Sequence, residues 1–527
     1  MKKIATDIYT FSELRRHDFT YVDKTAALLP MVDLSVGKQF FLARPRRFGK
    51  SLLISTIRAL FEGRRVLFGG LAIESRWDWS QTWPVIHLDF GSCQAESADG
   101  LWDKIRGQLR REAERHGVPL RENESVSNQF MFLLSDVIAA ADRKAKASNP
   151  NASVEQVVLL VDEYDKPLLA KLGTPEVTAF KNALKEFYSV IKTCEMQQRF
   201  TLITGVSKFS KVSIFSDLNN LTDLTMDARF ATLLGYTRTE LKANFSEHIV
   251  ALAEANGQTP EEAFARMERM YDGFKFEETA ERVFNPVSVG KCFASKKYGS
   301  FWFETGTPSF LLELLKRHPV DDTDLRLDAK AFGTFEPEQV RMLPLMYQTG
   351  YLTIKDVDKS GENPIYLLGY PNREVEDAMS YNLSQGMSYL PDDDFSAICN
   401  QISDGLKAGE PEAVLAGVRC FFENIPYDLQ VKYEKYYQSL FVSIFLMLKA
   451  RVSCEVKTAR GRIDVVVETS KFVYVLEFKV RGTSEEAIRQ IDEKGYADRF
   501  ASDPRKVFKI GCAFDWEKRN LGQWIVV

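Results

Sequence analysis

At 527 residues the chain is too long for a single hydrophobic core, so two or three domains are expected. Hydrophobic residues make up 45% and charged residues 27%, which is the composition of an ordinary globular protein and excludes a disordered chain. The net charge of −4 argues against a generic nucleic-acid coat. Residues 431–527, however, hold 18 Lys and Arg against 13 Asp and Glu, a basic balance compatible with nucleic acid there.

The sequence predicts a cytoplasmic protein without a membrane segment. The apolar run from Phe441 to Leu448 is far too short to cross a bilayer. At the N-terminus, Asp7 and Glu13 stand where an export signal would have its apolar core. The seven cysteines are scattered, and no close pair could frame a zinc site or a small disulfide scaffold. A reducing compartment fits this pattern.

The first expected strand begins at Gln39 and leads through a basic loop to Gly49, Lys50 and Ser51, where a helix begins. Such a loop surrounds a phosphate with backbone N–H groups and the positive end of a helix dipole. In this pattern Lys50 reaches the β- and γ-phosphates and Ser51 a Mg²⁺. Arg44 stands where the pattern has its first glycine, and arginine adopts a positive φ only at a cost. An ordinary basic turn before a helix is therefore an equal alternative for this segment alone.

A second segment favours the phosphate site. Residues 83–90 are expected to form the next strand, and residues 100–147 have helical spacing. Residues 157–161 are a continuous apolar run, typical of a strand buried on both faces of a parallel sheet, and Asp162 and Glu163 follow directly. In an ATPase, Asp162 would hold Mg²⁺ and Glu163 would polarise the attacking water. The alternative is a strand that ends in a solvated acidic turn.

The next expected helix covers residues 176–192 and is followed by a strand over residues 199–204. This strand can lie between the phosphate-loop strand and the acidic strand. Thr204 at its end would then place a hydroxyl near the γ-phosphate as a sensor. A threonine that only caps the turn is an equal alternative.

Residues 44–52, 160–165 and 204–215 together resemble the bacterial AAA-ATPase-like proteins that carry a PD-(D/E)XK nuclease-like domain at the C-terminus. The resemblance covers nearly the whole chain and includes residues 21–25 and 303–310. It implies a P-loop NTPase fold, with a parallel sheet and helices on both faces. It also implies that an arginine-rich loop replaces the glycine-rich one, so that Arg44 is a family trait.

The same resemblance implies ATP and Mg²⁺ as cofactors and a homo-oligomer through the ATPase domain. The nucleotide-binding residues that it implies, at the Walker A, Walker B and sensor positions, are Arg44, Pro45, Arg46, Arg47, Phe48, Gly49, Lys50, Ser51, Leu52, Asp162 and Thr204.

The middle of the chain is expected to be helical from about residue 235 to residue 330. A short helix from Val340 to Leu345 and two strands at residues 351–355 and 365–368 then follow the order of a winged-helix unit. Winged helices bind DNA, but this one lacks a strongly basic recognition helix. A lid on the ATPase is the favoured interpretation.

A second catalytic group is predicted near the C-terminus. Two expected strands carry Asp464 near the start of one and Glu477 and Lys479 at the end of the other. Because side chains two apart on a strand share a face, the three can converge on one point. Asp464 and Glu477 would hold Mg²⁺ and Lys479 would position the nucleophile for phosphodiester hydrolysis. The alternative is a half-buried hairpin with a charged outer face.

The D-x₁₂-E-x-K spacing of Asp464, Glu477 and Lys479 fits the core of the PD-(D/E)XK fold. Two more residues come from this resemblance. Gln490 lies on a helix that Thr483 and Glu486 open with capping-box spacing, and it would point into the active site. Glu434 would supply another metal ligand, or equally face solvent.

These observations predict three domains: a P-loop ATPase at residues 1–235, a helical lid and winged-helix-like region at 236–385, and a restriction-endonuclease-like α/β domain at 386–527. The expected function is an ATP-hydrolysing protein that controls a Mg²⁺-dependent nuclease acting on DNA or RNA. The alternative is a nucleotide-switched regulatory protein whose C-terminal fold binds nucleic acid without cutting it.

Overall fold

The computed structural model of the chain divides into two compact units. The first unit combines Met1–Glu304 with Arg326–Glu374, and the second combines Thr305–Leu325 with Val375–Val527. The structure describes residues 1–209, 220–302, 309–317, 325–329, 336–388, 390–424, 444, 451–458, 461–479, 482–515, 517–518 and 520–527. Among these residues, no helix combines the length and the apolar character needed to cross a membrane.

A parallel five-stranded sheet forms the centre of the first unit. Its order is β2-β3-β4-β1-β5, and every neighbouring pair is parallel. β4 therefore lies between β1 and β3, as the sequence predicted. The strands are β1 (Gln39–Ala43), β2 (Val85–Asp89), β3 (Val157–Asp162), β4 (Gln198–Gly205) and β5 (Thr222–Asp223).

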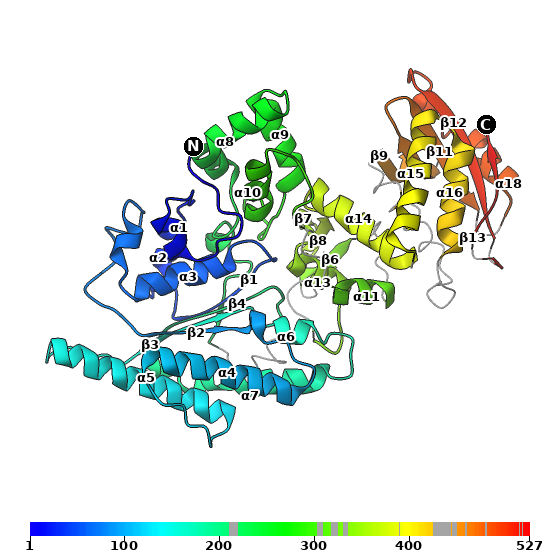
Figure 1. Cartoon of the computed structure of the whole chain (residues 1–527). Helices are drawn as coiled ribbons and strands as arrows, with labels where there is room; N and C mark the ends of the chain where they lie inside the picture. Colours follow the sequence, from blue (N-terminus) through cyan, green and yellow to red (C-terminus); the bar gives the residue numbers. More distant parts are fainter. Residues whose placement is uncertain are drawn as a thin grey trace. The chain divides into compact units, whose positions relative to one another are not determined.

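Helices cover both faces of this sheet (Figure 1), which is the architecture of a doubly wound α/β domain. On one side, α4, α5 and α7 pack together. On the other, α3 lies against β3 and β4, with α1 beside it. The helices are α1 (Phe11–Arg16), α2 (Thr25–Val32), α3 (Lys50–Phe61), α4 (Ala98–His116), α5 (Val126–Ser148), α6 (Lys166–Leu169) and α7 (Val177–Thr193).

A separate helical cluster belongs to the same unit. It consists of α8 (Arg238–Ala255), α9 (Pro260–Tyr271) and α10 (Pro286–Ser295), which share one apolar core. α8 and α9 both begin with a capping box, in which a threonine and a glutamate satisfy each other's backbone N–H groups. The helical pattern predicted after residue 235 is thus confirmed for this stretch.

A short helix and a small sheet complete the first unit. α13 (Met342–Thr349) precedes the antiparallel hairpin of β7 (Thr353–Asp358) and β8 (Ile365–Gly369), as predicted. A third strand, β6 (Arg326–Asp328), pairs with β8 and was not expected. The assignment of this region as a winged helix remains a prediction.

The second unit is built on a sheet of order β13-β12-β11-β10-β9. In it only β11 and β12 run parallel, and the other neighbouring pairs are antiparallel. Its helices are α11 (Ser309–Arg317), α14 (Arg373–Ser388), α15 (Asp392–Ala408), α16 (Pro411–Glu423) and α18 (Ser484–Glu493), and the first two residues of α14 belong to the first unit. Its strands are β9 (Arg451–Thr458), β10 (Gly461–Glu468), β11 (Phe472–Lys479), β12 (Lys506–Asp515) and β13 (Asn520–Val526).

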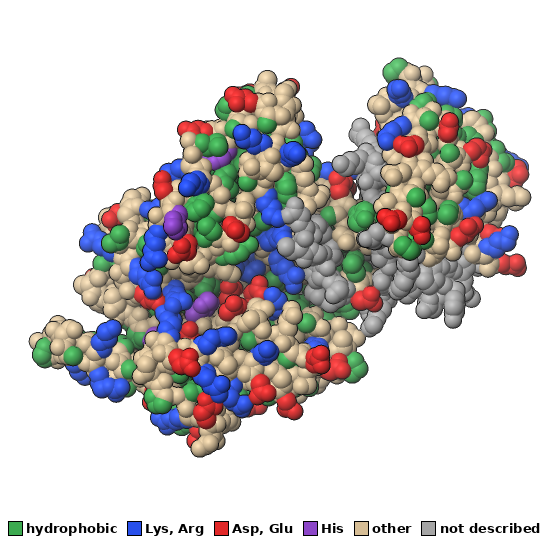
Figure 2. Space-filling view, in the orientation of Figure 1, with side chains coloured by type: hydrophobic (Ala, Val, Ile, Leu, Met, Phe, Trp, Pro, Cys, Tyr) green, Lys and Arg blue, Asp and Glu red, His purple; other side chains and the backbone are tan. Residues whose placement is uncertain are grey.

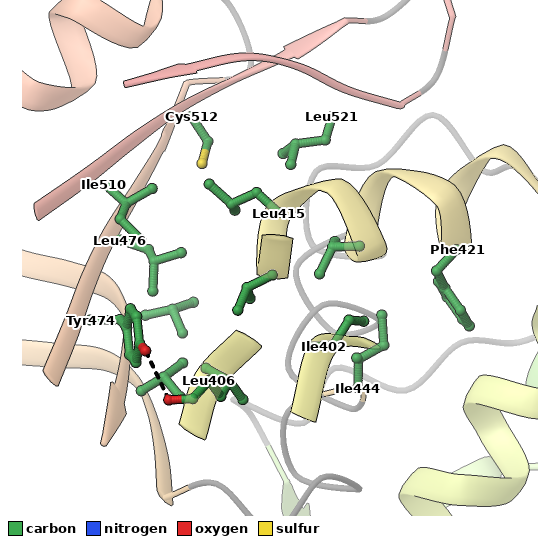
Figure 3. Packing of buried hydrophobic residues seen from close by; sticks show 14 of the residues in the cluster. Ile402, Leu406, Leu415, Phe421, Ile444, Tyr474, Leu476, Ile510, Cys512 and Leu521 are labelled. Carbon is green, nitrogen blue, oxygen red and sulfur yellow. Dashed lines mark hydrogen bonds between the residues drawn. The ribbon is translucent and has the colours of Figure 1, made fainter. Parts of the chain in front are cut away.

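The two faces of β11 are buried in different cores. Tyr474 and Leu476 pack in the larger core with residues of α15 and α16, where the Tyr474 hydroxyl donates to Leu406 O at 3.0 Å (Figure 3). Val473 and Val475 face the opposite side, in the core that includes residues of α18. Because side chains alternate along a strand, Glu477 continues the α18 side.

Candidate nucleotide and nuclease sites

The phosphate loop joins β1 to α3. Gly49 is the N-cap residue of α3 and has a φ of 94°, a value that favours glycine. Arg44 does not have a positive φ, so the backbone cost expected at that position does not arise. The other positive φ of the loop, 67°, belongs to Arg47. The residues of this loop with a positive φ are therefore Arg47 and Gly49, and not Arg44 at the position of the first glycine of a glycine-rich loop.

The Arg44 side chain is buried and holds the loop in place by hydrogen bonds. Only 1% of the residue is exposed, and its guanidinium donates to Thr225 O at 2.8 Å and to Phe230 O at 3.1 Å. It also lies over the Phe276 ring, 4.3 Å from the centroid. Burial lowers the pKa of Arg44 to about 10. The side chain thus anchors the loop to the segment after β5.

The other predicted loop residues differ in exposure. Pro45 and Phe48 are buried, and Phe48 packs its ring edge-on against two other phenylalanines of the unit. Arg46, Arg47 and Leu52 are partly exposed. Of these five side chains, the two arginines are therefore those that are both charged and partly exposed.

Lys50 and Ser51 begin α3 on the side of the loop that faces β3. Lys50 is 6% exposed, and its Nζ donates to the carbonyl oxygens of Arg44 and Pro45, each at 2.9 Å. Burial lowers the pKa of Lys50, and the nearby carboxylates, Asp162 first, oppose this effect. The Ser51 hydroxyl donates to Asp162 Oδ2 at 2.7 Å.

Asp162, at the end of β3, joins the loop to β4. Its Oδ1 accepts a hydrogen bond from the Thr204 hydroxyl at 2.6 Å and from the backbone N–H of Glu163 at 3.0 Å. Thr204 therefore orients this carboxylate, which a simple turn cap would not do. Glu163 has a φ of 50°, and its Oε2 lies 3.0 Å from Lys166 Nζ. The structure thus brings Ser51, Asp162 and Thr204 together.

The sequence prediction missed Asp165, the last carboxylate of the same motif. It is fully buried and accepts from Ser207 N at 2.6 Å, from Ser207 Oγ at 2.5 Å and from Val206 N at 3.1 Å. Burial raises the pKa of Asp165, although these donors oppose the shift. The carboxylate fixes the turn that follows Thr204. A third acid, three residues after Asp162, was the available signal.

On the face shown in Figure 2, Lys and Arg (blue) and Asp and Glu (red) lie close together around a hollow in the first unit.

Among the described residues, no group of three or more His, Cys, Asp or Glu could hold a metal by itself. Mg²⁺ commonly takes one or two protein oxygens and completes its shell with phosphate and water. The adjacent Ser51 hydroxyl and Asp162 carboxylate fit that requirement.

The predicted nuclease residues also come together, at the end of β11 in the second unit. The register that pairs Val465 with Leu476 places Asp464 level with Glu477. Asp464 Oδ2 accepts from Phe478 N at 2.9 Å, and Lys479 Nζ lies 3.5 Å from Glu477 Oε1. Two carboxylates and an ammonium group therefore meet at one point.

Gln490 of α18 completes this cluster. Its side-chain amide donates to Glu477 Oε1, and its own Oε1 accepts from Lys479 Nζ. Its Nε2 also lies 3.4 Å from the hydroxyl of Tyr496, a buried residue that sequence reasoning missed. The capping box of Thr483 and Glu486 fixes the start of the helix, as predicted.

The buried position of Glu477 suits a cation site. The residue is 2% exposed, and burial, together with the charge of Asp464, raises its pKa to about 7. Its Oε2 is buried without a hydrogen-bond partner within the part of the chain that the structure describes. A buried oxygen without a donor is costly, and a cation would satisfy it. Glu434, the third predicted ligand, lies outside the described residues.

Comparisons with known proteins identify a domain family in each of two segments of the chain. Residues 5–215 match the family model described as a predicted AAA-ATPase, and residues 432–524 match that of the PD-(D/E)XK nuclease superfamily. No solved structure matches the chain. The chain is 36% identical over 539 residues to an uncharacterized protein in the vnfD 5' region of Azotobacter chroococcum mcd 1, covering 100% of this chain and 99% of that protein. The chain belongs to the family of AAA-ATPase-like proteins that carry a C-terminal domain of the PD-(D/E)XK nuclease superfamily.

Proposed function

We propose that the first unit binds and hydrolyses ATP with Mg²⁺ and that its nucleotide state controls a Mg²⁺-dependent nuclease in the second unit, acting on DNA or RNA. The observation that carries this proposal is the pair of clusters, one in each unit, in which a lysine lies beside carboxylates. We further infer a cytoplasmic protein, a homo-oligomer through the ATPase domain, and a lid role for α13 and its hairpin.

For ATP hydrolysis, the loop and the start of α3 would surround the phosphates with backbone N–H groups. Lys50, now bonded to two loop carbonyls, would turn to the β- and γ-phosphates. Ser51 and Asp162 would hold Mg²⁺, which neutralises charge on the phosphates when bound. Glu163 would orient the attacking water, and Thr204 keeps Asp162 in place.

For phosphodiester hydrolysis, Asp464 and Glu477 would hold Mg²⁺, which polarises the phosphate and lowers the pKa of bound water. Lys479 would position the nucleophile or stabilise negative charge as it develops. Gln490 bonds to both Glu477 and Lys479, so it fixes their separation. This role makes Gln490 a positioning residue.

The test measures two activities on the purified full chain with Mg²⁺, beside Lys50→Ala and Lys479→Ala variants. We expect Lys50→Ala to lower ATP turnover by about a hundredfold, since it removes the cation of the phosphate site. Lys479→Ala should keep ATP turnover and lose cleavage of mixed DNA and RNA. ATP turnover unchanged in Lys50→Ala would refute the assigned ATPase site.

A second candidate is a regulatory protein whose second unit binds nucleic acid without cutting it. The observation that favours it is that Lys479 is already bonded to both Gln490 and Glu477 within the site. Absence of cleavage by the wild type on every substrate, with nucleic-acid binding retained, would select this candidate.

A further inference from the structure

The phosphate loop contacts the segment Phe301–Trp302 at two neighbouring residues. The Arg47 guanidinium donates to Phe301 O. The Trp302 indole N–H donates to Arg46 O at 3.3 Å. Although about 255 residues separate these partners in sequence, both bonds lie within the first unit. The position of the loop is therefore tied to the backbone of this segment.

Close packing at Gly350 strengthens the same contact. A Cβ built on Gly350 would lie 2.7 Å from Pro45 Cβ and 3.3 Å from the Trp302 ring, so neither could stay in place beside a larger residue. The Trp302 ring also lies 5.3 Å from the Tyr351 ring, centroid to centroid. Pro45 of the loop and Trp302 therefore both pack against Gly350, so a shift of the loop changes the packing beside Trp302.

Trp302 in turn contacts a buried carboxylate. Its backbone N–H donates to Glu374 Oε1 at 2.8 Å, and the Ser288 hydroxyl donates to Glu374 Oε2 at 2.8 Å. Glu374 is fully buried, and burial raises its pKa to about 7. Because a buried carboxylate without donors is costly, Glu374 has to follow the groups that donate to it.

Both residues lie beside the points where the chain leaves the first unit. Trp302 precedes Glu304, after which the chain enters the second unit. Glu374 is the last residue of the first unit, and it belongs to the first turn of α14, which continues into the second unit as far as Ser388. A shift at Glu374 therefore acts on a helix that both units share.

We propose that Trp302 and Glu374 transmit the nucleotide state of the phosphate loop to α14 and so to the nuclease-like unit. This inference rests on the proposed ATPase function. Arg47 is the sensing residue, because it is partly exposed and phosphate oxygens compete with Phe301 O for its guanidinium. Loss of that bond frees the Phe301–Trp302 backbone, and Glu374 follows.

Hydrogen–deuterium exchange on the full chain tests the relay. A non-hydrolysable ATP analogue should change exchange at residues 373–382 in the wild type. Trp302→Phe keeps the aromatic contact but removes the bond to Arg46 O, and Glu374→Gln removes the charge. Each should reduce the change at least threefold, while the Kd for the analogue stays within about threefold. Trp79→Phe is the matched control, because it removes an indole bond to Glu74 O instead.

Four results would overturn the relay. If the wild type binds the analogue without a change in exchange at α14, the relay is refuted. It is also refuted if both variants show the same exchange change as the wild type. Either result leaves the ATPase proposal standing. A Kd weakened more than tenfold in Trp302→Phe would place Trp302 in the nucleotide site instead. Failure of the wild type to bind the analogue would refute the ATPase proposal and the relay with it.

Discussion

Glu477 is the residue whose chemistry most clearly separates a site from a charged surface. A glutamate at the edge of a solvated hairpin would keep an ordinary pKa near 4.5. Here burial and the charge of Asp464 raise the pKa to about 7. The ionised form of Glu477 is therefore disfavoured until a cation binds, which is a common property of functional carboxylates.

This shift predicts how stability depends on pH without Mg²⁺. A raised pKa means that the folded protein still holds the Glu477 proton at pH values where the unfolded chain has released it. The stability that this proton contributes is therefore full below pH 4.5 and is lost as the pH rises through 7. Relative to the wild type, the free energy of unfolding of Glu477→Gln should therefore rise by about 1 to 3 kcal/mol between pH 4.5 and pH 8. Urea unfolding at both pH values measures this, with the exposed Glu493→Gln as control. Equal pH dependence in wild type and Glu477→Gln would contradict it.

The same pKa governs metal binding at this cluster. Mg²⁺ needs the ionised carboxylate, so its affinity should rise about tenfold between pH 6 and pH 8 as the Glu477 proton leaves. Calorimetric titration of Mg²⁺ into the full chain measures the affinity, in an Asp162→Asn background that removes the first site. An affinity independent of pH over this range would mean that Glu477 is not a ligand.

The end of β4 holds the residues of the proposed ATPase site together. Gly205 follows Thr204, and a Cβ there would lie 2.5 Å from carbons of the buried Tyr164 ring and 2.7 Å from Asp165 Oδ1. Gly205→Ala should therefore cost about 1 to 3 kcal/mol and lower ATP turnover, because Thr204 and Asp165 have to move. Thermal unfolding and ATP hydrolysis provide the two measurements.

Gly107→Ala is the matched control for that substitution. Gly107 lies inside α4, and a Cβ there meets no atom within 4 Å. Alanine should stabilise the helix by up to about 1 kcal/mol and leave ATP turnover unchanged. Equal changes in thermal stability and in ATP turnover in the two variants would show that the end of β4 does not constrain the site.

The buried elements could be predicted because their residues follow simple periodicity. The apolar run before Asp162 forms β3, and the run before Thr204 forms β4, as expected. The position of Arg44 could not be predicted, since its partners Thr225 and Phe230 are about 180 residues away. The same holds for β6, a three-residue strand that depends on pairing with β8.

The chain passes between its two compact units more than once. Residues 305–325 belong with the second unit, and residues 326–374 return to the first. Local sequence patterns carry no signal for such a crossing, because it depends on contacts between distant segments. The division into domains at residues 235 and 385 therefore stays a prediction.

The two groups of candidate site residues could be predicted as sets of residues, but their internal bonds could not. Spacing placed Glu477 and Lys479 on one face, and the structure has them there. That Gln490 bonds to both, and that Asp165 fixes the turn after Thr204, depends on how α18 and β4 pack.

The proposed function requires that one chain couples an ATP site to a nuclease site. The most direct measurement is cleavage of mixed DNA and RNA with Mg²⁺, with and without ATP, by the wild type and by Lys50→Ala. We predict that ATP changes cleavage by the wild type at least tenfold and does not change cleavage by Lys50→Ala. Cleavage that is the same with and without ATP in both proteins would contradict the claim.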